Sequence, residues 1–449
     1  MTPAASEPSS PRPNLFHVAL VLPWIALVVN AFATINDNSY LWHIRAGELQ
    51  MNSADVMTSD VFSFTVTGEP WRTQSWLVEL GYAWLEGVTG LAFTAPMVLV
   101  FSLLAFASIG AIAYRHSGGT VGAAIVLLLS AVILPRFIVP RPVLFSYFLF
   151  PLVILAWERA GTRWATPFLF WIWASVHGGF VIGLLYIGLR VLQQRDWSGL
   201  RVAVVSGAAC LTTAHGLGVV EMLVEFAQAR EYLAFIMEWQ TPNLLEPTLL
   251  PMVLVALLAV YGASRGHIRT RDLWLLGPFL ILALSSQRSV GMAWVGLIPI
   301  TSRALGPIRL RWVRGMSRPV VVAFIVVVLV LPLAFTEPAV IDDEVFPVEA
   351  ADDLADVNTF HDDGTGGYLI WAMGPEFPVY IDDRVELYDE RIEEFFNVRT
   401  RQEDWREVFA RDGIEQALLS VEEPLVDELA EEGWVVRHQD EYFTVLMTP

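Results

Sequence analysis

Long apolar segments recur along the first three quarters of the chain and limit what it can fold into. Of its 449 residues, 55% are hydrophobic and only 17% are charged. A bilayer core of about 30 Å needs about 20 apolar residues per crossing helix, whereas a soluble domain rarely contains so much apolar sequence. The composition therefore predicts an all-α polytopic membrane bundle. The apolar segments are 17–35, 91–114, 118–134, 143–157, 164–176, 180–192, 201–214, 248–263, 272–286, 290–302 and 319–336.

Charge divides the chain into two parts. All 28 basic residues are Arg, and 31 of the 47 acids but only 7 Arg lie from Glu337 onward, which gives charges of −24 for this end and +5 for the rest. An acidic, polar end of this length indicates a soluble domain with its own core and argues against nucleic-acid binding. We therefore expect a disordered tail over 1–16, a membrane domain over 17–336 and an acidic α/β domain over 337–449.

The acidic domain carries signals for both strands and helices. "FPVYID", "QALLSV" and "YFTVLM" predict strands, whereas "QEDWREVFARDG" and "EPLVDELAEEG" predict short helices that end at Gly. "HDDGTGGYLIW" and "YIDDRVELYDE" are typical of Gly- and Asp-rich turns that could bind a cation or sugar hydroxyls. No motif for nucleotide-driven transport or for a zinc protease is present.

The distribution of Arg predicts the membrane orientation. If segments 164–176 and 180–192 each cross, the chain has eleven spans, with 15 Arg on the side of the N-terminus and 6 on the other side. The positive-inside rule then places the N-terminus in the cytoplasm, and the loop 36–75 and the acidic domain outside. If 164–192 is one long span, an arrangement with the N-terminus outside gives the same count. Both arrangements place the acidic domain outside.

The loop 36–75 holds the first group of candidate site residues. Asp37 closely follows the first apolar segment, where a carboxylate could accept a proton from a hydroxyl or bind a cation. His43 and Asp60 could contact substrate, although a hydrogen-bonded structural His and a turn-capping Asp are equally ordinary. Trp71 and Gln74 offer a flat ring and an amide that suit a sugar, although aromatic side chains there also anchor a protein at the membrane interface.

Basic side chains in other external turns form the second group. Arg136 and Arg141 lie in "PRFIVPRP", His177 in "SVHGGF" and Arg288 in "SSQRSV". Arg binds phosphate through paired donors, so these turns around an acidic loop would suit a lipid phosphate. Glu238 lies in another polar segment of the same side, "MEWQTPN". Separate headgroup contacts by each Arg are the simpler alternative.

Several motifs together resemble a family of bacterial multi-pass proteins in the GT-C superfamily of membrane glycosyltransferases. They are "DNSYLWHIRAGEL", "SDVFSFTVTGEPWRTQSWLVEL", "RPVLFSYFLFPL", "WASVHGGFVIGL" and "GTGGYLIWAMGPEFPVYIDDRVELYDE". Two positions depart from the resemblance: relatives often carry His-Glu where this chain has Gln74-Ser75, and Asn-Pro-Tyr-Gly where it has residues 213–216. A different sugar or acceptor would explain both departures.

The resemblance implies a function and favours the eleven-span arrangement. Enzymes of this superfamily take a sugar from a polyprenyl-phosphate donor at the outer membrane face, with an acidic residue after the first helix as general base or metal ligand. Asp37 matches that position, and Arg136, Arg141, His177 and Arg288 are candidates for the donor phosphate. We therefore expect a lipid-embedded glycosyltransferase with an extracytoplasmic acceptor and no certain cofactor, a divalent cation being possible. A transporter of lipid-linked substrates and a cell-envelope scaffold are the alternatives.

Overall fold

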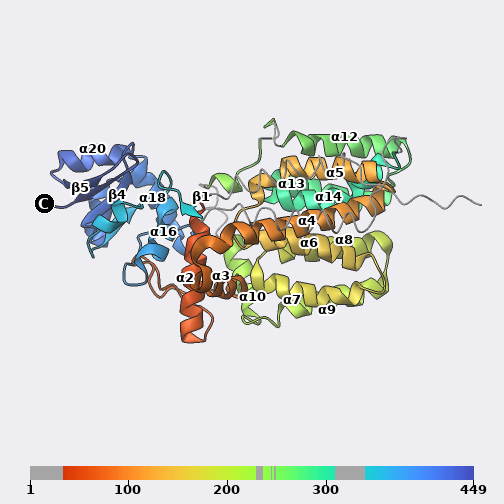
Figure 1. Ribbon diagram of the computed structural model, residues 1–449, viewed down its shortest axis with the longest axis horizontal. Coiled ribbons are helices and arrows are strands. Elements are labelled where there is room, and N and C mark those ends of the chain that lie inside the picture. Colours follow the sequence, from red (N-terminus) through yellow and green to blue (C-terminus); the bar gives the residue numbers. More distant parts are fainter. Residues whose placement is uncertain (1–33, 229–235, 244, 247–248, 309–338) are drawn as a thin grey trace, which may run out of the picture.

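The protein consists of a long helical bundle joined to a smaller α/β domain. The computed structural model describes residues 34–228, 236–243, 245–246, 249–308 and 339–449. Figure 1 shows the bundle on one side and the acidic C-terminal domain on the other, with α2 between them. The predicted segment 319–336 and the first apolar segment up to residue 33 lie outside the described residues. The mostly helical fold with a C-terminal α/β domain is confirmed.

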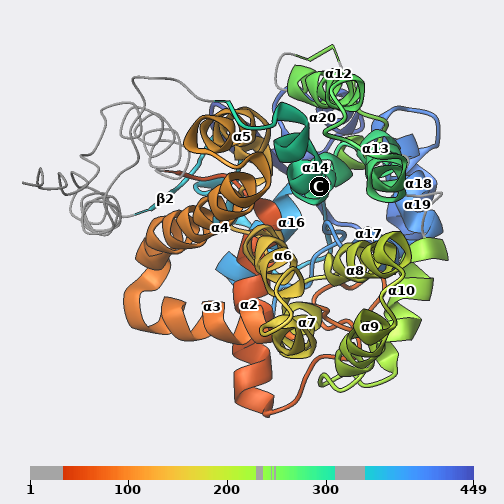
Figure 2. The ribbon, with the colours of Figure 1, turned by 90° about the vertical axis from the view of Figure 1, so that its right-hand side faces the viewer.

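Most of the predicted apolar segments form helices at nearly the predicted bounds. α14 lies in the middle of the bundle, against α4, α5, α12 and α13, as Figure 2 shows. The helices are α3 (Trp76–Thr89), α4 (Thr94–Ser117), α5 (Thr120–Ile133), α6 (Val143–Trp157), α7 (Thr166–Val176), α8 (Phe180–Gln194), α9 (Trp197–Cys210), α10 (Gly218–Gln228), α12 (Leu250–Ser264), α13 (Leu273–Ser285) and α14 (Ser289–Leu305). Short 3-10 turns are η1 (Gly90–Phe93), η2 (Pro135–Phe137), η3 (Arg163–Ala165), η4 (Met237–Trp239), η5 (Thr270–Asp272) and η6 (Ala350–Asp353).

The outer surface of the bundle is apolar. Phe168, Val260 and Ile281 are more than half exposed on three different helices, and such surfaces are expected where a protein contacts lipid. Among the described residues, one helical run, Trp76–Ser117, is long and apolar enough to cross a membrane, and five shorter apolar helices accompany it. The bundle is that of a membrane protein, and the number and direction of its crossings stay predictions.

The segment 164–192 forms two helices. α7 ends at Val176, and the backbone turns at Gly178 and Gly179 into α8. Both helices pack on α9 as separate elements. The arrangement with the N-terminus outside requires one long span over 164–192. The two separate helices found there favour the eleven-span arrangement.

The expectation of a polar loop over 36–75 is wrong at its beginning, where α2 (Asn38–Ser53) forms. Asp37 caps this helix by accepting a hydrogen bond from the backbone N–H of Tyr40 at 3.0 Å. α2 packs against α3 so closely that a side chain at Gly47 would lie 2.0 Å from the carbonyl oxygen of Glu79. Polar residues of α2 face buried partners in other elements, so the usual amphipathic pattern of a helix is absent.

The C-terminal domain contains a four-stranded sheet in the order β3-β4-β6-β5. β3 and β4 are parallel, and the other neighbours are antiparallel. The strands are β3 (Thr359–His361), β4 (Gln416–Ser420), β5 (Val435–Gln439) and β6 (Phe443–Met447), and the helices are α16 (Asp363–Met373), α17 (Val385–Tyr388), α18 (Glu390–Arg399), α19 (Trp405–Asp412) and α20 (Pro424–Glu431). A further parallel pair is formed by β1 (Thr34–Ile35), just before α2, and β2 (Val340–Ile341), at the start of the C-terminal domain.

Two predictions for this domain are wrong. "FPVYID" is not a strand of the sheet, because Val379 pairs with Phe62 and Phe64, in the segment between α2 and α3, instead. "HDDGTGGYLIW" is not a turn, because Asp362 accepts a hydrogen bond from the backbone of Gly364 and thereby starts α16. The strands predicted from "QALLSV" and "YFTVLM" and the helices α19 and α20 are confirmed.

Candidate active site

The buried Asp37 and the half-buried Arg141 form an ion pair at the start of α2. The Nε of Arg141 donates to both carboxylate oxygens of Asp37 at 2.8 Å. Asp37 is fixed as the N-cap of α2, and Arg141 by the Pro-bounded turn between η2 and α6. Two residues more than a hundred positions apart therefore meet at the end of the bundle that faces the C-terminal domain (Figure 1).

Glu238 connects Arg141 to Arg288. Its carboxylate lies 3.5 Å from Arg141 and 3.8 Å from Arg288. The backbone N–H of Arg288 also donates to the carbonyl of Glu238 at 2.9 Å, and the guanidinium lies 5.2 Å from the ring centre of Trp239. The result is a row of alternating charges, Asp37–Arg141–Glu238–Arg288, which we call the charge row.

Arg136 and His177 lie beside the charge row. Arg136 pairs with Glu246 at 2.8 Å and donates to the side chain of Gln287 at 3.1 Å, next to Arg288. His177 shares a hydrogen bond with the hydroxyl of Ser146 at 2.8 Å, and the charge of Arg288 acts on its ring. The structure thus brings the three predicted basic turns, with their four basic residues, to one end of the bundle.

Gln74 lies against the turn that follows His177. A side chain added to Gly178 would lie 2.7 Å from the Oε1 of Gln74. This close approach explains why the turn contains glycine, and it places the amide beside the half-buried His177. His215, at the second position where the chain departs from the family resemblance, hydrogen-bonds to the carbonyl of Thr73 at 2.7 Å. The two departures therefore meet in space.

His43 belongs to a buried polar network below the charge row. Its Nδ1 lies 2.7 Å from the carboxylate of Glu79, which has no exposed surface and also accepts hydrogen bonds from Gln50 and Thr73. These contacts hold α2 on α3. The sequence does not single out Glu79, because the pattern of the segment 76–90 around it is typical of an amphipathic helix at the membrane interface.

Asp60 and Trp71 surround Arg384 of the C-terminal domain. The guanidinium of Arg384 is buried, lies 2.7 Å from Asp60 and 2.6 Å from Asp382, and stands 4.7 Å from the ring centre of Trp71. The indole N–H of Trp71 donates to Glu386 at 3.1 Å, and burial raises the pKa of that carboxyl. The ring face of Trp71 is thus covered by the protein itself, and the geometry favours a structural function for both Asp60 and Trp71.

The C-terminal domain contributes a second carboxylate to the site. Asp383 accepts hydrogen bonds from Ser39 and from the indole N–H of Trp42, the latter at 2.7 Å, and its charge acts on Arg141. The sequence placed Asp383 in a motif that could bind a cation or a sugar, and its contact with α2 could not be predicted.

Two glycines allow α16 to pack closely, Gly367 against α2 and Gly366 within the C-terminal domain. A side chain at Gly367 would lie 2.3 Å from the carbonyl oxygen of Asn38, and one at Gly366 would lie 2.2 Å from that of Ile381. The amide of Asn38 in turn donates to the carbonyl of Asp363 at 2.8 Å. The motif "GTGG" therefore brings α16 directly against the residue that follows Asp37.

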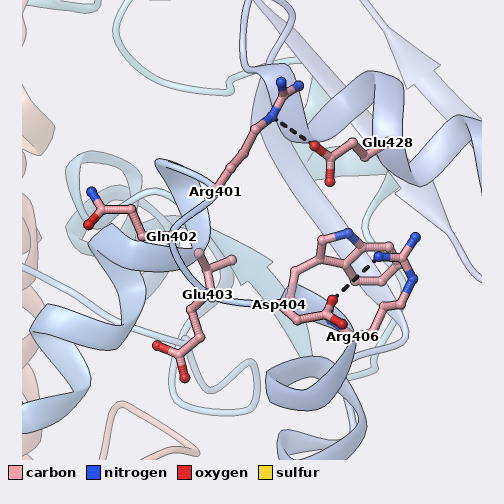
Figure 3. A pocket seen from close by; sticks show the side chains of 8 residues that line it. Arg401, Gln402, Glu403, Asp404, Arg406 and Glu428 are labelled. Carbon is pink, nitrogen blue, oxygen red and sulfur yellow. Dashed lines mark hydrogen bonds and ion pairs between the residues drawn. The ribbon is translucent and has the colours of Figure 1, made fainter.

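Within the described residues, the charge row is not part of a cluster of metal ligands. Across the described residues, no three His, Cys, Asp or Glu side chains gather as metal ligands. A pocket of about 350 Å³ lies on the C-terminal domain, between the end of α18, the start of α19 and α20, as Figure 3 shows. Its lining contains Arg401–Glu428 and Arg406–Asp404 ion pairs and none of the predicted site residues.

The overall fold matches that of a solved membrane enzyme. No family model and no curated protein matches the sequence. The crystal structure of ArnT from Cupriavidus metallidurans in the apo state superposes with a TM-score of 0.54 at 13% identity, over 96% of this chain and 97% of ArnT. The chain has the GT-C fold.

The GT-C fold confirms the resemblance that the motifs predict. The match covers both the bundle and the C-terminal domain, because nearly the full length of each chain is aligned. At 13% identity the match concerns the fold alone, so the functions of the individual residues rest on the geometry described above.

Proposed function

We propose that this protein transfers a sugar from a polyprenyl-phosphate donor to an extracytoplasmic acceptor. The observation that carries the proposal is the charge row, in which two carboxylates and two guanidinium groups from four distant segments meet at one end of a GT-C bundle. The eleven-span orientation, with this end and the C-terminal domain outside, is part of the same proposal.

The charge row would bind the donor through Arg141 and Arg288. Glu238 bridges the two guanidinium groups, and its side chain is 50% exposed, whereas that of Asp37 is 8% exposed. Displacing a half-exposed carboxylate costs little, because its ion pairs are weak in water. A donor phosphate would therefore replace Glu238, and Arg binds phosphate with paired, charge-assisted hydrogen bonds.

Asp37 would act as the general base. When Arg141 turns toward the phosphate, the carboxylate of Asp37 becomes free to accept a proton from the acceptor hydroxyl. The acceptor oxygen then bonds to the anomeric carbon, the bond between that carbon and the phosphate oxygen breaks, and polyprenyl phosphate leaves. Arg141 and Arg288 stabilise the charge that develops on the leaving phosphate. Transfer with inversion at the anomeric carbon follows from this single displacement.

A turnover assay on the Asp37→Asn variant tests the proposal. Asn also caps helices well, so α2 should keep its start, while loss of the base should lower the rate by about 10²–10⁴-fold. The assay measures polyprenyl phosphate released by the purified protein in detergent from a panel of polyprenyl-phospho-hexoses and -pentoses. Asp55→Asn, at an exposed position beyond α2, is the matched control.

The same assay separates the transferase from a transporter. Detergent solution holds no gradient and no second compartment, so a transporter would release no polyprenyl phosphate there. Release by the wild type and by Asp55→Asn, with loss in Asp37→Asn, supports transfer. Equal release by the wild type and Asp37→Asn would show that Asp37 is not the base. The absence of release from any donor would favour the transporter.

A further inference from the structure

A second group of ionisable side chains lies at the other end of the bundle. α4, α6, α8 and α14 end there and α13 begins there, and the opposite ends of these helices lie toward the C-terminal domain (Figure 1). We call this group the inner cluster. Its members are Arg115, His116, Glu158, Tyr186, Arg190, Gln193, Asp272 and Arg303.

The two carboxylates of the inner cluster already have partners. Glu158 lies 2.6 Å from the Nε2 of His116 and 3.5 Å from Arg115. Asp272 lies 3.0 Å from Arg303 and accepts a hydrogen bond from Gln193 at 2.8 Å. Both acids are buried, so these contacts compensate for their burial.

Arg190 lacks such a partner. It is only 8% exposed, and within the part of the chain that the structure describes no carboxylate lies within ion-pair distance of it. One Nη donates to the side chain of Gln193 at 2.6 Å, whereas the Nε is buried without an acceptor. The charge of Glu158 acts on Arg190 from beyond ion-pair distance. A guanidinium stays charged at all relevant pH values, so a buried one is stabilised by an anion in direct contact.

Two further donors beside Arg190 are also unsatisfied. The hydroxyl of Tyr186 and one Nη of Arg303 are buried without a hydrogen-bond partner among the described residues. Tyr186 and Arg190 are four residues apart on α8 and therefore share one face, and the charges of both Arg190 and Arg303 act on the Tyr186 hydroxyl. The inner cluster thus contains three unused donors, on Tyr186, Arg190 and Arg303, among its three Arg and two carboxylates.

We propose that the inner cluster binds a phosphate group. A phosphate accepts hydrogen bonds from all three donors and compensates the charge of Arg190. Arg115 and Arg303, whose side chains are 31% and 25% exposed, form the accessible rim. The group can come from a phospholipid headgroup of the membrane leaflet opposite to the charge row, or from free phosphate.

A thermal-shift experiment on the purified full chain tests the proposal. Tm is measured in detergent with increasing inorganic phosphate, against sodium chloride of equal ionic strength, and with dioctanoyl phosphatidylglycerol, against phosphate-free dioctanoylglycerol. We expect a saturable rise of Tm with a phosphate-bearing ligand. Arg190→Gln should weaken the apparent affinity about tenfold or more, whereas Arg201→Gln, at an exposed position of α9 near the same end, should not change it.

Each outcome decides for or against the inner cluster as a phosphate site. A response to inorganic phosphate identifies free phosphate, and a response to the phosphatidylglycerol alone identifies a headgroup. No response to either, or the same response in Arg190→Gln, overturns the proposal. If Arg190→Gln does not fold, Tyr186→Phe replaces it, because this change removes only the unpaired hydroxyl; an unchanged affinity in that variant likewise overturns the proposal.

Discussion

At the scale of single residues, exposure separates the charged groups that hold the fold from those that can exchange partners. Arg384 contacts Asp60, Asp382 and aromatic rings, and His43 of α2 is paired with Glu79 of α3. Breaking such buried pairs is strongly destabilising, by about 3–5 kcal/mol. Glu238, half exposed between Arg141 and Arg288, can leave at small cost. The phosphate should therefore displace the carboxylate of Glu238, while Asp37 keeps its place as the cap of α2 when Arg141 turns toward the phosphate.

This competition predicts that Glu238→Gln binds polyprenyl phosphate more tightly than the wild type. Removing the carboxylate leaves both guanidinium groups available, and an affinity gain of about fivefold to tenfold corresponds to one weak ion pair. Glu225→Gln is the matched control, since Glu225 is 49% exposed and lies 3.9 Å from Arg72. Binding of fluorescent polyprenyl phosphate to the purified protein measures the effect, and equal affinities in all three proteins would contradict it.

The sequence predicted some of these residues and not others for a physical reason. Asp37, Arg141, His177 and Arg288 each lie at a helix end, so the order of helices alone places them at one end of the bundle. The contacts of Asp60 and Asp383 depend on how the C-terminal domain packs on α2. A single sequence contains no periodicity or motif that reports such a contact.

At the scale of elements, the close packing of α16 on α2 positions the start of the site. Apolar length was sufficient to predict α4 to α9 and α12 to α14, because lipid-facing helices are apolar throughout. α2 was missed, because its polar side chains are used in buried hydrogen bonds such as that of Trp42 with Asp383. The strand predicted from "FPVYID" does not join the sheet, because its backbone pairs with residues 62–64, which the sequence could not indicate.

We therefore predict that Gly367→Ala lowers both Tm and transfer activity. The new methyl group would lie 2.3 Å from the carbonyl oxygen of Asn38 and would push α16 away from α2. Overpacking of this kind costs about 1–3 kcal/mol, although alanine favours the helix itself by about 1 kcal/mol. Thermal unfolding and the polyprenyl phosphate release assay measure the two effects.

Gly81→Ala is the control for this substitution. Gly81 lies within α3, and a side chain there meets nothing within 4 Å. The control should keep or slightly raise Tm and leave activity unchanged. A Gly367→Ala protein that behaves like Gly81→Ala would show that α16 does not need close contact with α2.

At the scale of the whole molecule, the acidic domain and the bundle act as one unit whose stability depends on pH. Burial, and then the negative charge of Asp362, raises the pKa of Asp363 from its ordinary 3.8 to about 8, partly offset by Arg399. Between about pH 4 and 8 the folded protein therefore holds a proton that the unfolded chain releases, so stability falls as pH rises through this window.

This linkage predicts that Asp363→Asn reduces the loss of stability between pH 5 and 8.5. The amide is neutral throughout, so the variant lacks the ionisation that opposes folding at higher pH. Tm measured across this range should fall less in Asp363→Asn than in the wild type. Asp352→Asn, at an exposed position of the same domain, should follow the wild type; parallel curves for all three proteins would show that Asp363 does not titrate in this range.

The central claim is that Arg141 and Arg288 hold the donor phosphate beside Asp37, and a cryo-electron microscopy structure with polyprenyl phosphate tests it most directly. The account predicts phosphate density between the two guanidinium groups, with the carboxylate of Glu238 displaced and Asp37 free of Arg141. Phosphate bound elsewhere, with the Asp37–Arg141–Glu238–Arg288 contacts unchanged, would contradict it.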